Sequence, residues 1–201
     1  MKSIHNCSVV FFEVSIDDRP AGRIVFKLYV DVAPVTAEIF RTLCTGERCC
    51  RINQKALSYK DSTFHRVIKN CVIQGGSIIR GNGSSGDFIS GYQLEDKTLE
   101  LEHDRPFLLS MANSGPGSNR YQFLITTVPT PQLNGIHVVF GEVIQGRAIV
   151  SLIESTPTLL GFKPCQEIKV TNCGGLTSAQ AELARLTAES SIRGKIKNYR
   201  F

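Results

Sequence analysis

The sequence predicts a mainly β fold, a closed β-barrel with a helix over each of its openings. Two patterns support this prediction. Many short runs of β-branched and aromatic residues are separated by Gly, Pro and Asn turns, and helical patterns occur near both ends of the chain. A length of 201 residues, with 42% hydrophobic and 20% charged residues, is typical of one globular domain with a short tail.

The expected elements follow in chain order. Residues 9–16 and 22–30 mix β-branched and aromatic residues with polar ones, and the turn residues between them predict a β-hairpin. Pro34 favours a helix start, and residues 35–44 carry apolar side chains at helical spacing. Further strands are expected at 63–68, 71–74, 107–111, 121–127, 137–143 and 166–172, a second helix at 148–155, and irregular structure at 45–60 and 75–91.

The charge pattern argues against two classes of partner. The formal net charge is +5, and residues 177–201 hold five basic but only two acidic residues, so the body of the chain is nearly neutral. A nearly neutral body argues against nucleic-acid binding. The N-terminus makes a poor signal peptide, and the apolar run 9–12 is too short to span a membrane. We therefore expect a cytoplasmic or nuclear protein without a membrane partner.

The cysteines and glycines are read as structural. The seven cysteines are odd in number and show neither a disulfide framework nor zinc-ligand spacing. We expect reduced thiols, no metal and no cofactor. The glycines between 75 and 86 could cradle a phosphate, but no G-K-[S/T] follows them, so turn geometry explains them better.

Several short segments occur in a fixed order and spacing over about residues 7–176. They are Thr36-Ala37-Glu38, Phe40-Arg41, Cys44-Thr45-Gly46-Glu47, Phe64-His65-Arg66-Val67-Ile68, Gln74-Gly75-Gly76, Leu109 to Pro116, Asn119, Gln122-Phe123, His137 to Val143 and Cys173-Gly174. Together these segments resemble the cyclophilins. The resemblance implies an eight-stranded antiparallel barrel with two capping helices for residues 7–176, which leaves residues 177–201 as a basic tail that is helical or bound to a partner. The loop 48–58 is similar in length to the insertion of divergent-loop cyclophilins, although its composition differs.

The resemblance implies a peptidyl-prolyl cis-trans isomerase, or rotamase, of protein folding. Rotation about a peptide bond meets a barrier of about 18–20 kcal/mol from amide resonance, and the two X-Pro isomers differ little in energy. A permanently charged donor beside the pyramidal nitrogen of the twisted bond would favour that state. By resemblance, Arg66 is this donor, Gln74 orients it or the substrate carbonyl, and Asn113 holds the substrate backbone.

The resemblance also implies an apolar slot for the proline ring. His65 would lie on its rim. Phe123 and Leu124 are neighbours on one strand, so only one of them can face the slot. Several alternatives stay open: Arg66 as an ordinary surface arginine, His65 and His137 as structural histidines, and Gln74 and Asn113 as partners of the barrel backbone. The assigned slot and groove residues are Val72, Ala112, Gln122, Phe123, Leu124, Leu133 and the flank of His137.

The slot departs from the family pattern. Cys71 and Leu124 stand where the family has phenylalanine, Val72 where it has methionine, and Gln132 where it has tryptophan or histidine. Aliphatic replacements plausibly remove about 1–3 kcal/mol of substrate binding. We therefore expect reduced or narrowed isomerase activity and weak or no binding of cyclosporin, the family's macrocyclic inhibitor.

Two further hypotheses concern partners and redox state. As an alternative to an enzyme, the barrel is a binding or scaffold subunit of a larger assembly of the spliceosomal or axonemal type, with a cytoskeletal location in the latter case. The tail would then dock the partner through Tyr199, Phe201, Ile192 and Ile196. The resemblance also pairs Cys44 with Cys173 as a redox switch, against which structural thiols are the alternative.

Overall fold

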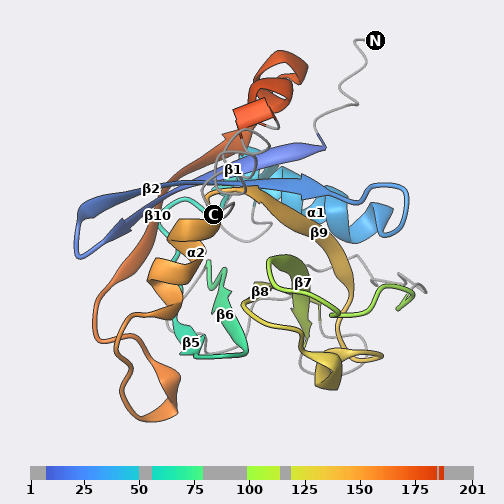
Figure 1. Cartoon of the computed structure of the whole chain (residues 1–201). Helices are drawn as coiled ribbons and strands as arrows, with labels where there is room; N and C mark the ends of the chain where they lie inside the picture. Colours follow the sequence, from blue (N-terminus) through green and yellow to red (C-terminus); the bar gives the residue numbers. More distant parts are fainter. Residues whose placement is uncertain (1–7, 50–55, 79–98, 114–118, 185, 188–201) are drawn as a thin grey trace, which may run out of the picture.

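The computed structural model describes residues 8–49, 56–78, 99–113, 119–184, 186 and 187, with the backbone alone at 48, 49, 113, 119 and 120. Strands dominate this part of the chain, and helices and two 3₁₀ turns accompany them (Figure 1). The elements are β1 (Val9–Ile16), β2 (Arg19–Leu28), α1 (Pro34–Thr45), β3 (Arg48–Cys49), β4 (Ala56–Leu57), β5 (Arg66–Ile68), β6 (Val72–Gly75), β7 (Leu108–Asn113), β8 (Asn119–Thr126), η1 (Pro131–Leu133), β9 (Val139–Gln145), α2 (Arg147–Glu154), η2 (Leu160–Phe162) and β10 (Ile168–Gly175).

Eight strands form one antiparallel sheet in the order β10-β1-β2-β9-β7-β8-β6-β5. The sheet curls until its edges meet. The backbone N–H of Phe64, just before β5, donates to the carbonyl of Ile168 in β10 at 2.9 Å, and Val170 donates to Ser62 at 2.9 Å. The expected mainly β fold, with eight antiparallel strands curled into a barrel, is confirmed.

Two local departures from the predicted elements have clear causes. Asp17 and Asp18 both have positive φ, 47° and 61°, which lets a two-residue turn join β1 to β2. Strand β2 therefore begins at Arg19 and not at residue 22. The segment expected to be irregular also contains the short ribbon β3–β4, whereas residues 50–55 of the divergent-loop-like insertion lie outside the described residues.

An aromatic cluster fills the barrel. The rings of Phe40 and Tyr59 lie 4.9 Å apart, and Phe12 and Phe26 lie 5.0 Å apart. The Tyr59 hydroxyl donates to the carbonyl of Tyr121 at 2.7 Å, so its only polar atom is satisfied, and burial raises its pKa well above the ordinary value. Helix α1 contributes Phe40 to this core, and α2 contributes Val150 and Ile153.

A glycine lets the strands approach the aromatic cluster closely. Gly76 has φ of 88°, and a Cβ atom there would lie 2.6 Å from the carbonyl oxygen of Tyr121 and 2.9 Å from the Tyr59 ring. Only glycine meets both conditions without displacing β8. Because Gly76 follows β6 directly, the strand packs tightly against the core. This packing fixes the position of the outward-facing residues on β6.

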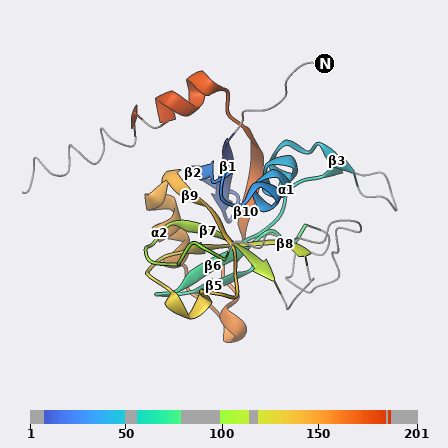
Figure 2. The same ribbon diagram turned by 90° about the vertical axis from the view of Figure 1, so that its right-hand side faces the viewer.

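The chain continues past β10 into a helical segment, residues 178–184 with 186 and 187, that lies over the top of β1 and β2 (Figure 2). Thr177 and Gln180 form a capping box, because the Thr177 N–H donates to Gln180 Oε1 at 3.0 Å and the Gln180 N–H donates to Thr177 Oγ1 at 3.4 Å. Ala184 packs with Val9, Val25 and Leu176. The proposed anchors Ile192, Ile196, Tyr199 and Phe201 lie outside the described residues.

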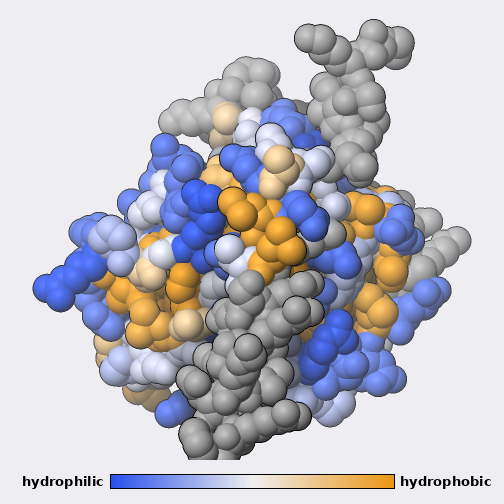
Figure 3. Space-filling model, turned by 45° about the horizontal axis from the view of Figure 1, so that its top comes forward, coloured by the Kyte–Doolittle hydropathy of each residue, from blue (hydrophilic) through white to orange (hydrophobic). Residues whose placement is uncertain are grey.

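The surface around this segment is mixed. Figure 3 shows apolar patches set among hydrophilic residues on the top of the molecule, without one continuous apolar face. Across the described ranges, no helix has the length and apolar character needed to cross a membrane.

Candidate functional site

The outer face of strands β5, β6, β8 and β7 carries the predicted site. Side chains alternate between the two faces of a strand, and the register places Arg66 opposite Gln74, which in turn lies opposite Leu124. Their chain neighbours Val67, Ile73 and Phe123 point into the core. The polar and apolar candidates therefore share one face because three strands are paired in this register.

An apolar cluster forms the predicted slot. Val72, Ala112 and Leu124 are buried together, with exposed fractions of 5%, 7% and 5%, and Leu133 packs against them from η1. Ile68 and Cys71 complete the cluster. Sequence reasoning missed Ile68, although its spacing of two from Arg66 on a strand indicates the same face.

Phe123 is a correction to the predicted slot. The structure buries it completely in the aromatic core, where its ring lies 5.3 Å from that of Tyr59 and 5.5 Å from that of Phe40. Leu124 alone faces the slot, since consecutive strand residues face opposite ways. Phe123 therefore supports the slot from behind and cannot line it.

The polar residues are only partly arranged as expected. Arg66 is exposed, and among the described residues its guanidinium makes neither a hydrogen bond nor an ion pair. The Gln74 amide donates to Gln122 Oε1 at 2.7 Å, and within the described ranges no hydrogen bond joins Gln74 to Arg66. The backbone of Asn113 pairs with Asn119, but the Asn113 side chain lies outside the described part of the chain. Gln122 is also at the site and is buried, whereas Gln74 is half-buried.

Two predicted histidines flank the slot. His137 Nδ1 lies 3.1 Å from the carbonyl oxygen of Met111, which can only accept, so Nδ1 carries a hydrogen. Burial lowers the pKa of both His137 and His65, and the charge of Arg66 adds to this effect at His65. His65 is only partly exposed, as a rim position requires.

A third histidine, which sequence reasoning missed, fixes one wall of the slot. His103 is completely buried; its Nδ1 lies 3.0 Å and its backbone nitrogen 2.8 Å from Asn134 Oδ1, while its Nε2 lies 2.9 Å from Ser110 Oγ. Asn134 directly follows Leu133, and Ser110 lies opposite Leu124. His103 therefore ties η1 to β7 behind the apolar cluster. A lone histidine in a loop gives no sequence signal for this.

We predict that His103 makes the domain less stable in mild acid. Burial lowers its pKa in the folded state, whereas the unfolded chain has the ordinary value of about 6.5. The contribution of His103 to the free energy of unfolding is therefore fully present at a pH above the ordinary pKa. It is lost as the pH falls through the lowered pKa of the folded state. Urea unfolding at pH 7.5 and 5.5 should show a smaller pH-dependent loss of unfolding free energy for His103→Gln than for the wild type. An equal loss in both proteins would contradict this.

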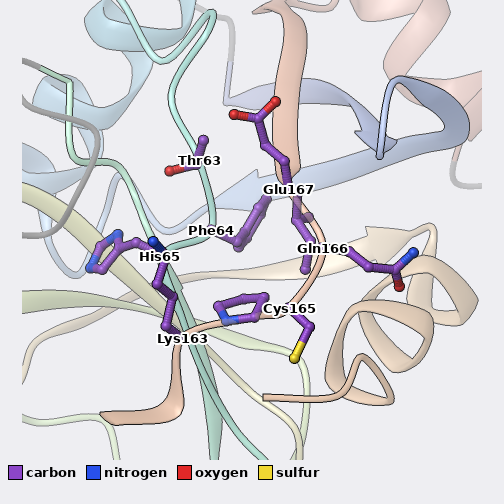
Figure 4. A pocket seen from close by; sticks show the side chains of 9 residues that line it. Thr63, Phe64, His65, Lys163, Cys165, Gln166 and Glu167 are labelled. Carbon is purple, nitrogen blue, oxygen red and sulfur yellow. The ribbon is translucent and has the colours of Figure 1, made fainter. Parts of the chain in front are cut away.

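A pocket of about 280 Å³ adjoins the site beyond His65. It lies between the segment 63–65 and the chain from Lys163 to Ile168, and the Lys163 side chain extends toward His65 (Figure 4). Cys165 and Glu167 also line it. The pocket therefore shares His65 with the rim of the slot.

Cys44 and Cys173 are not joined in a disulfide. Cys173 Sγ lies 3.4 Å from Ser58 Oγ, and burial raises the pKa of the Cys173 thiol, which disfavours the reactive thiolate. In the part of the chain that is described, no three His, Cys, Asp or Glu side chains gather as potential metal ligands.

Comparison with known proteins supplies the remaining finding. The family model for "Cyclophilin type peptidyl-prolyl cis-trans isomerase/CLD" matches residues 11–175, which include every strand of the site. A curated protein of Kluyveromyces lactis named "Peptidyl-prolyl cis-trans isomerase D" is 51% identical over 170 residues. The match covers 84% of this chain but 46% of that protein, so the chain spans about half the length of its relative.

Proposed function

Because the chain belongs to the cyclophilin family, we propose that its barrel catalyses cis/trans isomerisation of X-Pro bonds in peptides or protein segments. One observation carries the proposal: an exposed guanidinium, which has no hydrogen-bond or ion-pair partner among the described residues, shares one face of the sheet with a compact apolar cluster. The cluster would hold the proline ring, and Arg66 would reach the imide nitrogen.

The chemistry needs only this pair of features. No bond breaks, so the enzyme must bind the twisted amide better than either planar isomer. Twisting removes resonance and returns a lone pair to nitrogen, which Arg66 can meet with a charged N–H donor. Asn113 would hold the substrate backbone. The hydrogen-bonded side chains of Gln74 and Gln122 would lie beside the proline ring of the substrate. His65 would border the flanking residue of the substrate.

We propose that the aliphatic slot narrows this activity. Val72, Leu124 and Leu133 offer less flat apolar surface to a proline ring than aromatic side chains would. Gln132 is exposed and its amide lies 3.7 Å from Cys71 Sγ, so it adds no ring to the wall. Weak or no cyclosporin binding follows from the same loss of surface.

Exchange NMR on a short peptide with one X-Pro bond tests the proposed function. Uncatalysed cis/trans exchange takes tens to hundreds of seconds. Adding the domain should make this exchange much faster, which appears as exchange between, or broadening of, the separate cis and trans resonances of the peptide. The same peptide with proline replaced by alanine should move the amide resonances of Ile68 and Leu124 less than the proline peptide does. Unchanged cis/trans exchange would refute catalysis, and equal shifts with both peptides would refute a proline slot.

The same altered slot supports a second candidate function, a cyclophilin-fold binding or scaffold subunit of a larger spliceosomal or axonemal assembly. In that case residues 177–201 form a separate tail that meets the partner. Proline-peptide binding without accelerated exchange in the preceding experiment would favour this candidate. A cytoplasmic or nuclear location, or a cytoskeletal one for an axonemal complex, and the absence of nucleic-acid and membrane partners remain parts of the proposal.

A further inference from the structure

An aromatic ring from a distant hairpin lies against the candidate catalytic arginine. The Cζ atom of Arg66 is 5.5 Å from the centroid of the Phe162 ring, within cation–π range. Phe162 ends η2, and this turn packs against β5, which carries Arg66. The hairpin follows α2 and lies beside β5 (Figure 1).

The type of contact matters for what Arg66 can still do. A carboxylate partner would occupy the in-plane N–H donors of the guanidinium and offset its charge. An aromatic ring meets a guanidinium through the ring face and leaves those donors available for a substrate. The Gln74 amide donates to Gln122, whereas the Phe162 ring contacts the guanidinium directly and can restrict the orientation of Arg66.

The hairpin that carries Phe162 is held rigidly. The Cys165 N–H donates to the Pro157 carbonyl at 2.8 Å, and the Leu159 N–H donates to the Lys163 carbonyl at 2.8 Å. The Phe162 N–H closes the turn by donating to the Leu159 carbonyl at 3.0 Å. These bonds fix the backbone from which the ring projects, so the ring can act as a stable platform.

The turn also keeps Phe162 in an unfavourable conformation. Its φ is 64°, in the left-handed region that bulky residues rarely adopt. Phe162 is 45% exposed, so burial in the core does not explain why a phenylalanine stands there. Strained residues of this kind concentrate at functional sites, where the surrounding structure maintains them.

We propose that Phe162 is a positioning residue for Arg66, holding the guanidinium at the edge of the slot with its donors directed to the substrate. The proposal rests on the proposed isomerase function and extends it to the hairpin 157–165. It also gives Arg66 an aromatic neighbour from outside the four strands of the site.

Kinetics of matched variants test the proposal. Phe162→Leu keeps the apolar bulk and the same backbone demand, and it should lower kcat/KM about three- to fivefold, mainly through kcat, as expected for an exposed cation–π pair. Phe162→Tyr keeps the ring and should stay within about twofold of the wild type. Leu160→Ala is the control, since Leu160 is in the same turn but fully exposed. In an Arg66→Ala background, Phe162→Leu should have no further effect.

A second readout does not depend on activity. The side-chain Nε–Hε resonance of Arg66 should carry a ring-current shift that Phe162→Leu abolishes and Leu160→Ala preserves. An inactive wild type with the shift intact would refute the proposed function, and with it the positioning of Arg66 for catalysis by Phe162. An active wild type in which Phe162→Leu retains full kcat, or lowers it equally in the Arg66→Ala background, would overturn the positioning role alone.

Discussion

Replacing Arg66 by alanine is expected to lower kcat/KM for X-Pro isomerisation about a hundredfold, the usual loss when one transition-state donor is removed. The loss should appear mainly in kcat, because Arg66 lies at the edge of the apolar cluster and the twisted amide needs its charge more than either planar isomer does. Protease-coupled or exchange kinetics at several peptide concentrations would separate kcat from KM.

Two matched variants sharpen this test. Arg66→Lys keeps the charge but loses the planar fork, so its activity should lie between those of Arg66→Ala and the wild type. Arg23→Ala is the control: Arg23 is also exposed and also stacked on a ring, 4.4 Å from the Phe11 centroid, but it lies on β2 and is bonded to Glu13. Equal activity of Arg66→Ala and the wild type would remove Arg66 from the mechanism.

The parts of the site that follow from local pattern could be predicted from the sequence. Strand alternation places Arg66, Val72 and Gln74 on one face once β5 and β6 are recognised. The same rule left Phe123 and Leu124 undecided, because a run of apolar residues does not show which face is the core. The register of β8 with β6 decides it, and register depends on pairing between distant segments.

The remaining features depend on tertiary structure alone. His103 reaches the slot wall through Asn134, and Phe162 reaches Arg66 through a hairpin that lies far along the chain. Neither residue has a neighbour in sequence that indicates its role. The early start of β2 was missed for a local reason: the sequence allows several turns over 17–22, and the positive φ values of Asp17 and Asp18 select the shortest.

The neighbours Phe123 and Leu124 should separate stability from substrate binding. Phe123→Ala is expected to lower the free energy of unfolding by about 3–5 kcal/mol, because it leaves a cavity among closely packed rings. The Phe123 ring lies 5.5 Å from that of Phe12 and 5.6 Å from that of Phe64. Phe123→Leu leaves a smaller cavity and should lose less free energy of unfolding than Phe123→Ala. If Phe123→Ala fails to fold, urea unfolding of Phe123→Leu still measures the effect.

Leu124→Ala should lower substrate binding more than stability. The Leu124 side chain lies in a small cluster bordered by the partly exposed Ile68, Cys71 and Leu133. Solvent and neighbouring side chains can fill the space, so the loss of unfolding free energy should be about 2 kcal/mol, near the low end of the range for buried leucines. Proline-peptide affinity, measured by NMR titration, should fall severalfold in Leu124→Ala and stay near the wild-type value in Phe123→Leu. Weaker peptide binding by Phe123→Leu than by Leu124→Ala would mean that the face of β8 has been assigned the wrong way round. The comparison therefore tests the strand register on which the whole arrangement of Arg66 and the slot depends.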